Sequence, residues 1–261
     1  MMGAGFSADE IFMKSAKNTN FRLHNHDRYE IYLFLEGDSK YIVEENVYNL
    51  EPYDMIIIRK HEMHRVYHNS NAKYRRFVLM ISPDYFKDCP EYEEVFLKSS
   101  AGRGNKINSD VVRSSGIYDA VMRLKKYSDG YSLSESPVIK GTITEILYIL
   151  NSISHFSVGD NSNNQLKEVI SYINNNYTDE ITLDILEEKF YISKYHLCRI
   201  FKEATGLTVQ NYIRQKRLTY VSELKRQGKN LTEAATLAGF NDYSSFYRAY
   251  KNKYKKSPKM I

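Results

Sequence analysis

The sequence predicts two domains of different class: an N-terminal all-β barrel with following helices, and a C-terminal all-α domain with two helix-turn-helix units joined by a long helix. Three observations lead to this multidomain fold. Residues 21–82 contain short runs that are rich in β-branched and aromatic residues. From residue 165 onward, every periodic segment has helical spacing. Between these parts lies the polar run SVGDNSNN, residues 157–164, which is typical of a linker.

The composition excludes several classes of protein. Of the 261 residues, 42% are apolar and 26% are charged, which predicts a packed, soluble core. There is no run of 18 apolar residues and no secretory pattern at the N-terminus, so we expect no membrane partner. The two cysteines, Cys89 and Cys198, are too few for a disulfide framework or a cysteine zinc site. They fit a reducing compartment, and the sequence therefore predicts a cytoplasmic protein.

Charge is distributed unevenly along the chain. Residues 165–261 hold 17 Lys and Arg against 10 Asp and Glu, whereas residues 1–164 hold 20 against 22. A basic C-terminal part beside a near-neutral remainder indicates that one domain meets a polyanion. Solvated helix faces would give the same counts, so charge alone leaves both interpretations open.

Four runs are predicted to form strands of the barrel, which we assign to residues 1–88. Turn-like segments such as EGDS, EENVYN, EPYD and HNSNAK separate them. Closely spaced short strands of this kind favour a sandwich or a small barrel. The runs are YEIYLFL (29–35), KYIVEE (40–45), MIIIRK (55–60) and RRFVLMI (75–81).

Two amphipathic helices are predicted after the barrel, over residues 109–128 and 137–156. Pro137 is a favoured first residue for the second of them. These helices either cover the open end of the barrel or pair with the same helices of a second chain, and we assign residues 89–156 to a helical dimerisation region. The expected apolar faces comprise Val112, Ile117, Val121, Met122 and Leu124, and then Ile139, Ile143, Ile146, Leu147 and Leu150.

The first helix-turn-helix unit is predicted over residues 183–206. A short helix ends near Phe190, a tight turn follows, and Ser193 is a good N-cap for the second helix. Gly206 is expected to end that helix. Leu197, Ile200 and Phe201 should pack inward, which leaves an exposed face for the major groove of DNA. That face holds Lys194, Tyr195, Cys198, Arg199 and Lys202.

The pattern returns over residues 231–254, with a sharp turn at Gly239-Phe240 and Asp242 as the second N-cap. Residues 208–227 form the helix between the two units, which would be about 30 Å long. Because successive major-groove segments on one side of DNA are about 34 Å apart, a spacer of this length can place both recognition helices in adjacent segments. The exposed face of the second recognition helix holds Tyr243, Ser244, Tyr247, Arg248 and Lys251.

Three quoted segments carry a family resemblance: ISKYHLCRIFKEATG (192–206), YIRQKRL (212–218) and AGFNDYSSFYRAYKNKYKKSP (238–258). With them, residues 165–261 resemble the DNA-binding domain of AraC-type transcriptional regulators. The resemblance implies base reading by Tyr195, Cys198 and Arg199 in the first unit, and by Tyr243, Ser244, Tyr247 and Arg248 in the second. Basic residues on the exposed helix faces are predicted to contact DNA phosphates, namely Lys194, Lys202, Arg214, Lys216 and Lys251.

The chain departs from the family pattern at three positions. Glu187 stands where a small residue is usual, Ala234 where a larger apolar residue is common, and Lys255 where glycine is usual. The first two concern local packing, and the third concerns how the last helix ends. None of them removes a predicted recognition residue.

The stretch HNHDRYE begins a pattern, His24-x-His26-xxx-Glu30, that with His64 resembles the two motifs of a cupin barrel. In metal-bearing cupins these positions bind one ion, so the resemblance implies a divalent metal such as Fe, Mn, Ni or Zn at His24, His26, Glu30 and His64. The second motif departs from the cupin form, with Tyr53, Arg59 and His61 in place of glycine, proline and glycine. The shared parity of His24, His26 and Glu30 predicts that an unbroken strand would point them to one side.

Three interpretations of this pattern stay open: a pocket for an organic effector, a metal site, and a purely structural role. The effector pocket is favoured, and its predicted residues are His24, His26, Glu30, Tyr32 and His64. Aromatic and imidazole groups stack on and hydrogen-bond to a sugar or similar polyol, and the sensing half of AraC-type regulators is itself a cupin-like barrel. We therefore predict no cofactor, with the metal as the alternative.

The sequence thus predicts a DNA-binding transcriptional regulator that responds to a small effector bound in the barrel, with a sugar or related polar metabolite favoured. The expected partners are double-stranded DNA, the effector, a second copy of the chain in a homodimer and, for an activator, RNA polymerase. We expect no enzyme, because neither a nucleotide-binding glycine loop nor a G-x-S-x-G elbow occurs. Two alternatives remain: a metal-dependent cupin oxygenase or isomerase fused to a DNA-binding domain, and an effector-independent dimeric regulator.

Overall fold

A computed structural model of the chain describes residues 5–16, 21–98, 103–128, 136–153 and 164–258. The chain divides into two compact units: Met1–Phe21 with Arg28–Asp160, and Arg22–Asp27 with Asn161–Ile261. Of the predicted linker 157–164, all but its last residue lies outside the described residues. Within the described part of the chain, no helix has both the length and the apolar character needed to cross a lipid bilayer.

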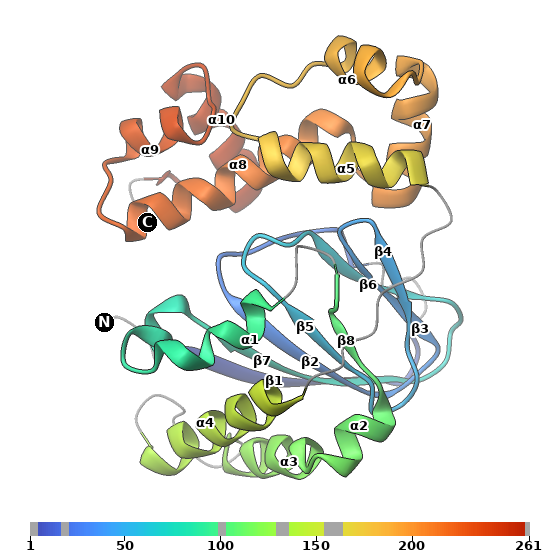
Figure 1. The fold of residues 1–261 in the computed structure, drawn as a ribbon, viewed down its shortest axis with the longest axis vertical. Coiled ribbons are helices and arrows are strands. Elements are labelled where there is room, and N and C mark those ends of the chain that lie inside the picture. Colours follow the sequence, from blue (N-terminus) through green and yellow to red (C-terminus); the bar gives the residue numbers. More distant parts are fainter. Residues whose placement is uncertain (1–4, 17–20, 99–102, 129–135, 154–163, 259–261) are drawn as a thin grey trace. The chain divides into compact units, whose positions relative to one another are not determined.

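The first unit is built on two antiparallel sheets (Figure 1). A five-stranded sheet has the order β1-β7-β2-β5-β8, and a three-stranded sheet has the order β4-β3-β6. The strands are β1 (Phe6–Met13), β2 (Tyr29–Glu36), β3 (Ser39–Val43), β4 (Asn46–Asn49), β5 (Met55–Ile58), β6 (His64–His68), β7 (Tyr74–Ile81) and β8 (Lys106–Ile107).

All four predicted strands are confirmed, as β2, β3, β5 and β7, but four others were missed. The segment EENVYN was expected to be a turn. Only its first part is one, because Glu44 has φ +52°, whereas Asn46–Asn49 pairs with β3. The strands β1, β6 and β8 carry many polar or charged residues, so their sequences lack the β-branched and aromatic enrichment that marks the other strands.

Strand β2 separates two apolar cores. Its residues Tyr29, Ile31 and Leu33 belong to a core shared with the helices, whereas Tyr32 and Phe34 belong to a second core that also contains residues of β3 and β4. Because successive side chains of a strand point to opposite faces, Glu30 shares the face of Tyr32. The expected alternation of β2 therefore places the carboxylate of Glu30 on the barrel-interior side.

Helices cover the outer face of the five-stranded sheet (Figure 1). The predicted helix 109–128 is interrupted at Gly116, whose φ of +79° breaks the helical path. Of the residues predicted for its apolar face, Met122 is only half-buried, while the other four are buried in the shared core. The elements are η1 (Pro83–Lys87), η2 (Pro90–Tyr92), α1 (Glu94–Leu97), α2 (Ser109–Ser114), α3 (Ile117–Ser128) and α4 (Pro137–Ser152).

The second unit is helical, as predicted, and a side chain caps the N-terminus of each of its last five helices. Thr182, Ser193, Thr208, Asn230 and Asp242 each accept a hydrogen bond from the backbone N–H three residues later. The helices are α5 (Asn164–Asn176), α6 (Leu183–Phe190), α7 (Lys194–Thr205), α8 (Val209–Arg226), α9 (Leu231–Leu237) and α10 (Tyr243–Tyr254).

The three departures from the family pattern are each accommodated locally. The carboxylate of Glu187 accepts a hydrogen bond from the backbone N–H of Lys194, 3.1 Å away, and so ties α6 to the start of α7. Ala234 is fully buried in the core beside α8 and α10. Lys255 takes the left-handed conformation of the usual glycine, with φ +58°, and its N–H still closes α10 on the carbonyl of Lys251.

Candidate nucleic-acid interface and effector site

The exposed face of α7 holds the three residues predicted to read bases in the first helix-turn-helix unit. Tyr195 is 82% exposed, and Cys198 and Arg199 are also exposed. Leu197 and Phe201 are fully buried, which fixes how the helix is rotated about its axis. The helix therefore presents the predicted residues outward, in the positions that a recognition helix needs.

Arg199 is already engaged on its own helix. Its Nη1 lies 3.2 Å from Oε1 of Glu203, one turn further on, and its Nη2 lies 3.2 Å from Nδ1 of His196. An exposed pair of this spacing contributes only about 0.3–0.5 kcal/mol, so a guanine can displace Glu203 at little cost. Sequence reasoning did not include His196, although its i, i+3 spacing to Arg199 places it on the same face.

Lys194 and Lys202 were predicted to contact phosphates, and their surroundings differ. Nζ of Lys194 lies 2.5 Å from the carboxylate of Asp184 on α6, and 3.6 Å from that of Glu187. The hydrogen bond to Asp184 raises the pKa of Lys194. Lys202 is exposed, and its side chain forms no ion pair with any of the residues that the structure describes. Lys202 is therefore the freer of the two for a phosphate.

On α10, Tyr243, Ser244, Arg248 and Lys251 are exposed and Tyr247 is half-buried. The rings of Tyr243 and Tyr247 lie side by side, with centroids 6.5 Å apart. Phe246 is fully buried and packs on Phe240 of the turn, as the predicted inward face requires. Helix α10 thus presents the predicted set outward.

Helix α8 requires one correction. Arg214 is exposed, as a phosphate contact requires, but Lys216 is only 4% exposed. Its spacing places it on a buried stripe with Tyr212 and Thr219, and its Nζ lies 5.9 Å from the ring centroid of Tyr212. The predicted position of Lys216 on the exposed face is therefore wrong, and we no longer assign it to a DNA phosphate.

In the barrel, the side chains of Tyr41 and His64, from the three-stranded sheet, meet the carboxylate of Glu30 on the five-stranded sheet. The hydroxyl of Tyr41 donates to Oε1 of Glu30 over 3.2 Å, and Nε2 of His64 lies 3.4 Å from Oε2. The rings of Tyr41 and His64 are nearly parallel, at 11° with centroids 6.2 Å apart. All three residues are buried. We call Glu30, Tyr41 and His64 the barrel cluster.

The protonation of the barrel cluster follows from its geometry. Burial alone lowers the pKa of His64, but hydrogen bonding and the charge of Glu30 outweigh it, so the pKa is raised. Nδ1 of His64 donates to the carbonyl of Glu62 over 2.8 Å, which directs Nε2 toward Glu30. Burial, and next the charge of Glu30, raise the pKa of Tyr41 well above its usual value. Its hydroxyl therefore stays protonated.

Tyr32, the further predicted effector residue, extends the barrel cluster toward β7. Its hydroxyl lies 2.9 Å from that of Tyr74, and its ring packs against that of Tyr41 with centroids 4.7 Å apart. The guanidinium of Arg76 lies 5.7 Å from the Tyr32 ring centroid. Sequence reasoning missed Tyr74 and Arg76, because only the pairing of β7 with β2 brings them to this face.

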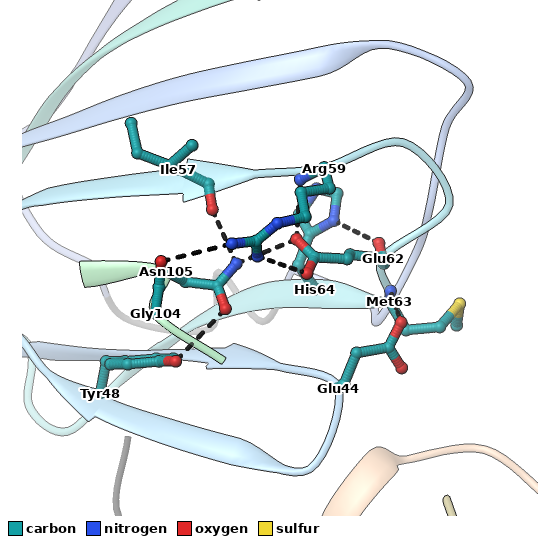
Figure 2. Close-up of polar contacts among 9 residues, drawn as sticks. All are labelled: Glu44, Tyr48, Ile57, Arg59, Glu62, Met63, His64, Gly104 and Asn105. Atoms are coloured by element: carbon teal, nitrogen blue, oxygen red, sulfur yellow. Dashed lines mark hydrogen bonds and ion pairs between the residues drawn. The ribbon is translucent and has the colours of Figure 1, made fainter. Parts of the chain in front are cut away.

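A second polar network holds the loop that carries His64 (Figure 2). Arg59 donates to Glu62 through its Nη1 over 2.9 Å and through its backbone N–H over 2.7 Å. The amide of Asn105 donates to Glu62 over 2.9 Å and to the carbonyl of Ile57 over 2.7 Å. Tyr48 donates to Asn105 over 3.3 Å. The network thus links the β5–β6 loop to β4 and to the residue before β8.

The remaining predicted effector residues, His24 and His26, lie in the segment Arg22–Asp27 that groups with the second unit. His24 is exposed and His26 is half-buried, and their ring centroids are 6.1 Å apart. Glu30 and His64 offer a carboxylate oxygen and an imidazole nitrogen, donors that a borderline divalent metal accepts. That pair therefore fits such an ion, and the four-residue metal site stays a prediction.

Comparison with known proteins decides the family. A model described as an AraC-like ligand binding domain matches residues 11–136, and one described as a helix-turn-helix domain matches residues 186–261. Together they span both sites. The chain belongs to the AraC family of transcriptional regulators. It is a DNA-binding regulator with a ligand-binding domain, and not an enzyme.

Several relatives of this AraC-family protein span nearly the whole chain. The HTH-type transcriptional activator RhaS of Yersinia pestis is 24% identical over 97% of this chain and 93% of its own length. RhaS of Escherichia coli O1:K1 is 23% identical over 93% and 87%. Among solved structures, ToxT from Vibrio cholerae is 14% identical, covers 98% of this chain and 97% of its own, and has a TM-score of 0.41.

The barrel cluster of this AraC-family protein predicts a pH-dependent stability. Because the folded-state pKa of His64 is raised above its unfolded value of about 6.5, the interaction is fully present below that pH and is lost as the pH rises through the folded-state pKa. We expect the stability advantage of the wild type over His64→Gln to be largest near pH 6 and to shrink toward pH 9, in urea unfolding at several pH values.

A second histidine provides a control of opposite sign. Burial lowers the pKa of His68, so its folded state favours the neutral ring. The stability of the wild type relative to His68→Gln should therefore rise, not fall, as the pH increases through this range. If both variants gave the same slope, the assignment of a charged His64 beside Glu30 would be wrong.

Proposed function

We propose that this AraC-family protein regulates transcription in response to a small polar effector, a sugar or related polyol, that binds at the barrel cluster. The observation that carries the proposal is the burial of Glu30, Tyr41 and His64 together between two sheets of the ligand-binding domain. A carboxylate accepts hydrogen bonds from hydroxyl groups, and tyrosine rings stack on the apolar face of a sugar. Tyr32 remains a further predicted contact of this site, and the roles of His24 and His26 remain predictions from the sequence alone.

The geometry supports the sugar over an apolar effector for an energetic reason. Even a buried carboxylate that is paired and hydrogen-bonded, as Glu30 is, often stabilises a fold less than well-packed apolar residues of similar volume. A polar ligand that hydrogen-bonds to the carboxylate of Glu30 would account for its presence in the core despite the free-energy cost of burying it. Binding of the effector in the barrel would favour one of two conformations of the protein, and the two would differ in how the DNA-binding helices are presented to DNA.

The output and the assembly are further parts of the proposal. The RhaS relatives are named as transcriptional activators, which supports activation and therefore a contact with RNA polymerase. A homodimer is supported by the outer face of α4, where Val138 and Tyr148 are 57% and 62% exposed. The predicted apolar stripes of α3 and α4 themselves pack within this chain. We place the protein in the cytoplasm, with the DNA.

The test is a titration of the full chain with a panel of sugars, sugar alcohols and sugar acids. We expect one of them to change both the melting temperature and the affinity for DNA, and Glu30→Gln to weaken that response at least tenfold, since hydrogen bonds to a charged group contribute about 1.5–3 kcal/mol. Glu36→Gln is the matched control, because Glu36 ends the same strand but is exposed.

Two outcomes would contradict the proposal. If the panel leaves melting and DNA affinity unchanged, the effector-independent regulator becomes the better hypothesis. If Glu30→Gln and Glu36→Gln respond to the effector alike, the effector binds elsewhere. A metal that co-purifies in stoichiometric amount, and is lost in His64→Gln, would favour the metal site over a direct polyol contact.

A further inference from the structure

A cleft of ≈ 410 Å³ lies between α8 and α10 of the DNA-binding unit. One wall is formed by α8 and the other by α10 with the turn before it. The volume falls in the range of about 300–1,000 Å³ that small-molecule sites occupy, and it exceeds that of a single phosphate group. The polar residues that line it include Arg214, Arg217, Asn241, Asp242, Arg248 and Asn252.

The cleft carries an excess of positive charge, with three arginines against one carboxylate. Arg217 is committed to the fold, because its Nε and Nη2 donate to the carbonyls of Tyr177 and Asp179 over 2.6 and 2.7 Å. The carboxylate of Asp242 is also committed, since it caps α10 and accepts from the backbone N–H and hydroxyl of Ser245.

Two guanidinium groups of the cleft form no close ion pair with the described residues, although the charge of Arg248 is among the smaller causes that lower the pKa of Asp242. Arg214 donates to the amide oxygen of Asn211 over 2.7 Å, and Arg248 lies 3.5 Å from the hydroxyl of Ser245. Neither forms an ion pair within the part of the chain that the structure describes. Burial is the largest cause that lowers the pKa of Arg217, and the positive charge of Arg214 is the next. A bound anion would therefore offset the repulsion between these two arginines.

The rotation of α10 separates Arg248 from the tyrosines that were predicted to read bases with it. At 3.6 residues per turn, Arg248 lies about 100° around the axis from Tyr247 and about 140° from Tyr243. Its neighbours toward the cleft, Ser245 and Asn252, are three residues before it and four after it, and both line the cleft. Arg248 therefore belongs to the cleft side of the helix.

We propose that this cleft is a phosphate-binding site in which Arg214 and Arg248 hold one phosphate group, with Asn241 and Asn252 as further donors. Arginine suits this chemistry because its planar fork matches the oxygens of a phosphate. The inference deepens the proposed DNA-binding function and rests on it: the site clamps a phosphate of the DNA backbone, and Arg248 anchors the second helix-turn-helix unit instead of reading a base. A free phosphate has the same chemistry, and the experiment distinguishes the two sources.

The experiment measures binding of the full chain to a fluorescent duplex selected from random DNA and to a random duplex of equal length, at several salt concentrations. We expect Arg248→Gln to weaken binding to both duplexes about tenfold, to lower the salt slope by about one, and to leave the selected bases unchanged. Arg199→Ala is the comparison for base reading, and it should relax preference at one position.

Arg214→Gln tests whether the two arginines share one phosphate. We expect the double variant to lose less affinity than the product of the two single losses, because the first substitution already releases the phosphate. Lys87→Gln is the control, because it removes one positive charge from the first unit. Lys87 is exposed, ion-paired and outside the DNA-binding unit, so its loss should change the affinity for DNA by no more than about twofold. Far-UV circular dichroism checks that each variant keeps its helices.

The remaining outcomes each decide the proposal. Unchanged DNA binding, together with inorganic phosphate that binds the wild type but not Arg248→Gln in calorimetry, supports the site with free phosphate as its ligand. Three results would overturn the proposed phosphate site. They are a relaxed base preference in Arg248→Gln, losses of affinity that multiply in the double variant, and no change in either assay. A wild type that selects no DNA sequence would refute sequence-specific binding instead, while the random duplex and inorganic phosphate still test the cleft.

Discussion

Replacing Gly239 with alanine is expected to lower the free energy of unfolding of the DNA-binding unit by about 2–5 kcal/mol. Gly239 forms the turn of the second helix-turn-helix unit with φ +88°, a conformation that costs an alanine about 1–2 kcal/mol. A Cβ at this position would also lie 2.2 Å from the carbonyl oxygen of Thr178, and such overpacking costs about 1–3 kcal/mol. Both costs, the strained backbone conformation and the overlap with Thr178, arise from the same added Cβ atom.

The neighbours of Thr178 explain why the overlap cannot relax cheaply. Arg217 donates to the carbonyls on either side of it, those of Tyr177 and Asp179, and so holds this stretch of backbone against α8. A shift of Thr178 would stretch both bonds. We therefore expect Gly239→Ala to impair DNA binding as well, because the turn sets the position of α10.

Gly228→Ala is the control for this prediction. Gly228 has nearly the same backbone conformation, with φ +92°, but a Cβ there would meet nothing within 4 Å. It should cost only the conformational part, about 1–2 kcal/mol. Urea unfolding of the full chain, followed by circular dichroism, measures both variants. Equal losses in the two variants would show that the contact with Thr178 does not matter.

Glu62→Ala is expected to destabilise the barrel by about 3–5 kcal/mol, which is the usual cost of removing one partner from a buried ion pair. The side chain of Glu62 is 1% exposed and that of Arg59 is 10% exposed, so the substitution leaves a buried guanidinium without its carboxylate. It also removes one of the two acceptors of the Asn105 amide, which keeps its hydrogen bond to the carbonyl of Ile57 (Figure 2). The loop that carries His64 should loosen with it.

The matched control is an exposed ion pair of the same i, i+3 spacing. Asp84 and Lys87 lie 2.9 Å apart in η1, but their side chains are 46% and 75% exposed. Asp84→Ala should therefore cost about 1 kcal/mol or less. If Glu62→Ala cost no more than Asp84→Ala in the same urea unfolding experiment, burial of the Arg59–Glu62 pair would not stabilise the barrel.

Short-range sequence patterns predicted much of the DNA-binding unit, because the residues that begin, end and orient its helices act over only a few positions. Helix caps such as Ser193 and Asp242, and the glycine turn at Gly239, act on residues three or four positions away. The apolar spacing of α7 and α10 likewise fixed which residues point outward. The same reasoning failed for Lys216, because a lysine in a stripe of buried residues looks in the sequence like one on a solvated face.

The barrel shows where local patterns are insufficient. Short polar strands such as β6 and β8 have no signal of their own and form only because a neighbouring strand offers its backbone groups. The buried pair of Arg59 and Glu62 occupies a loop that its charges would place in solvent. Asn105, which completes that network, lies 43 residues from Glu62 in the sequence, so no spacing rule connects them.

The sequence by itself determined the order of the two domains, the helices of the DNA-binding unit, most of the residues that α7 and α10 expose, and the family. These follow from propensity, periodicity and capping, which act over a few residues. Only the tertiary structure decided that Tyr41 joins Glu30 and His64, and that Arg248 lines the cleft with Arg214. Strand pairing and helix packing bring distant residues together, and the energy of those contacts exists only once the chain has folded.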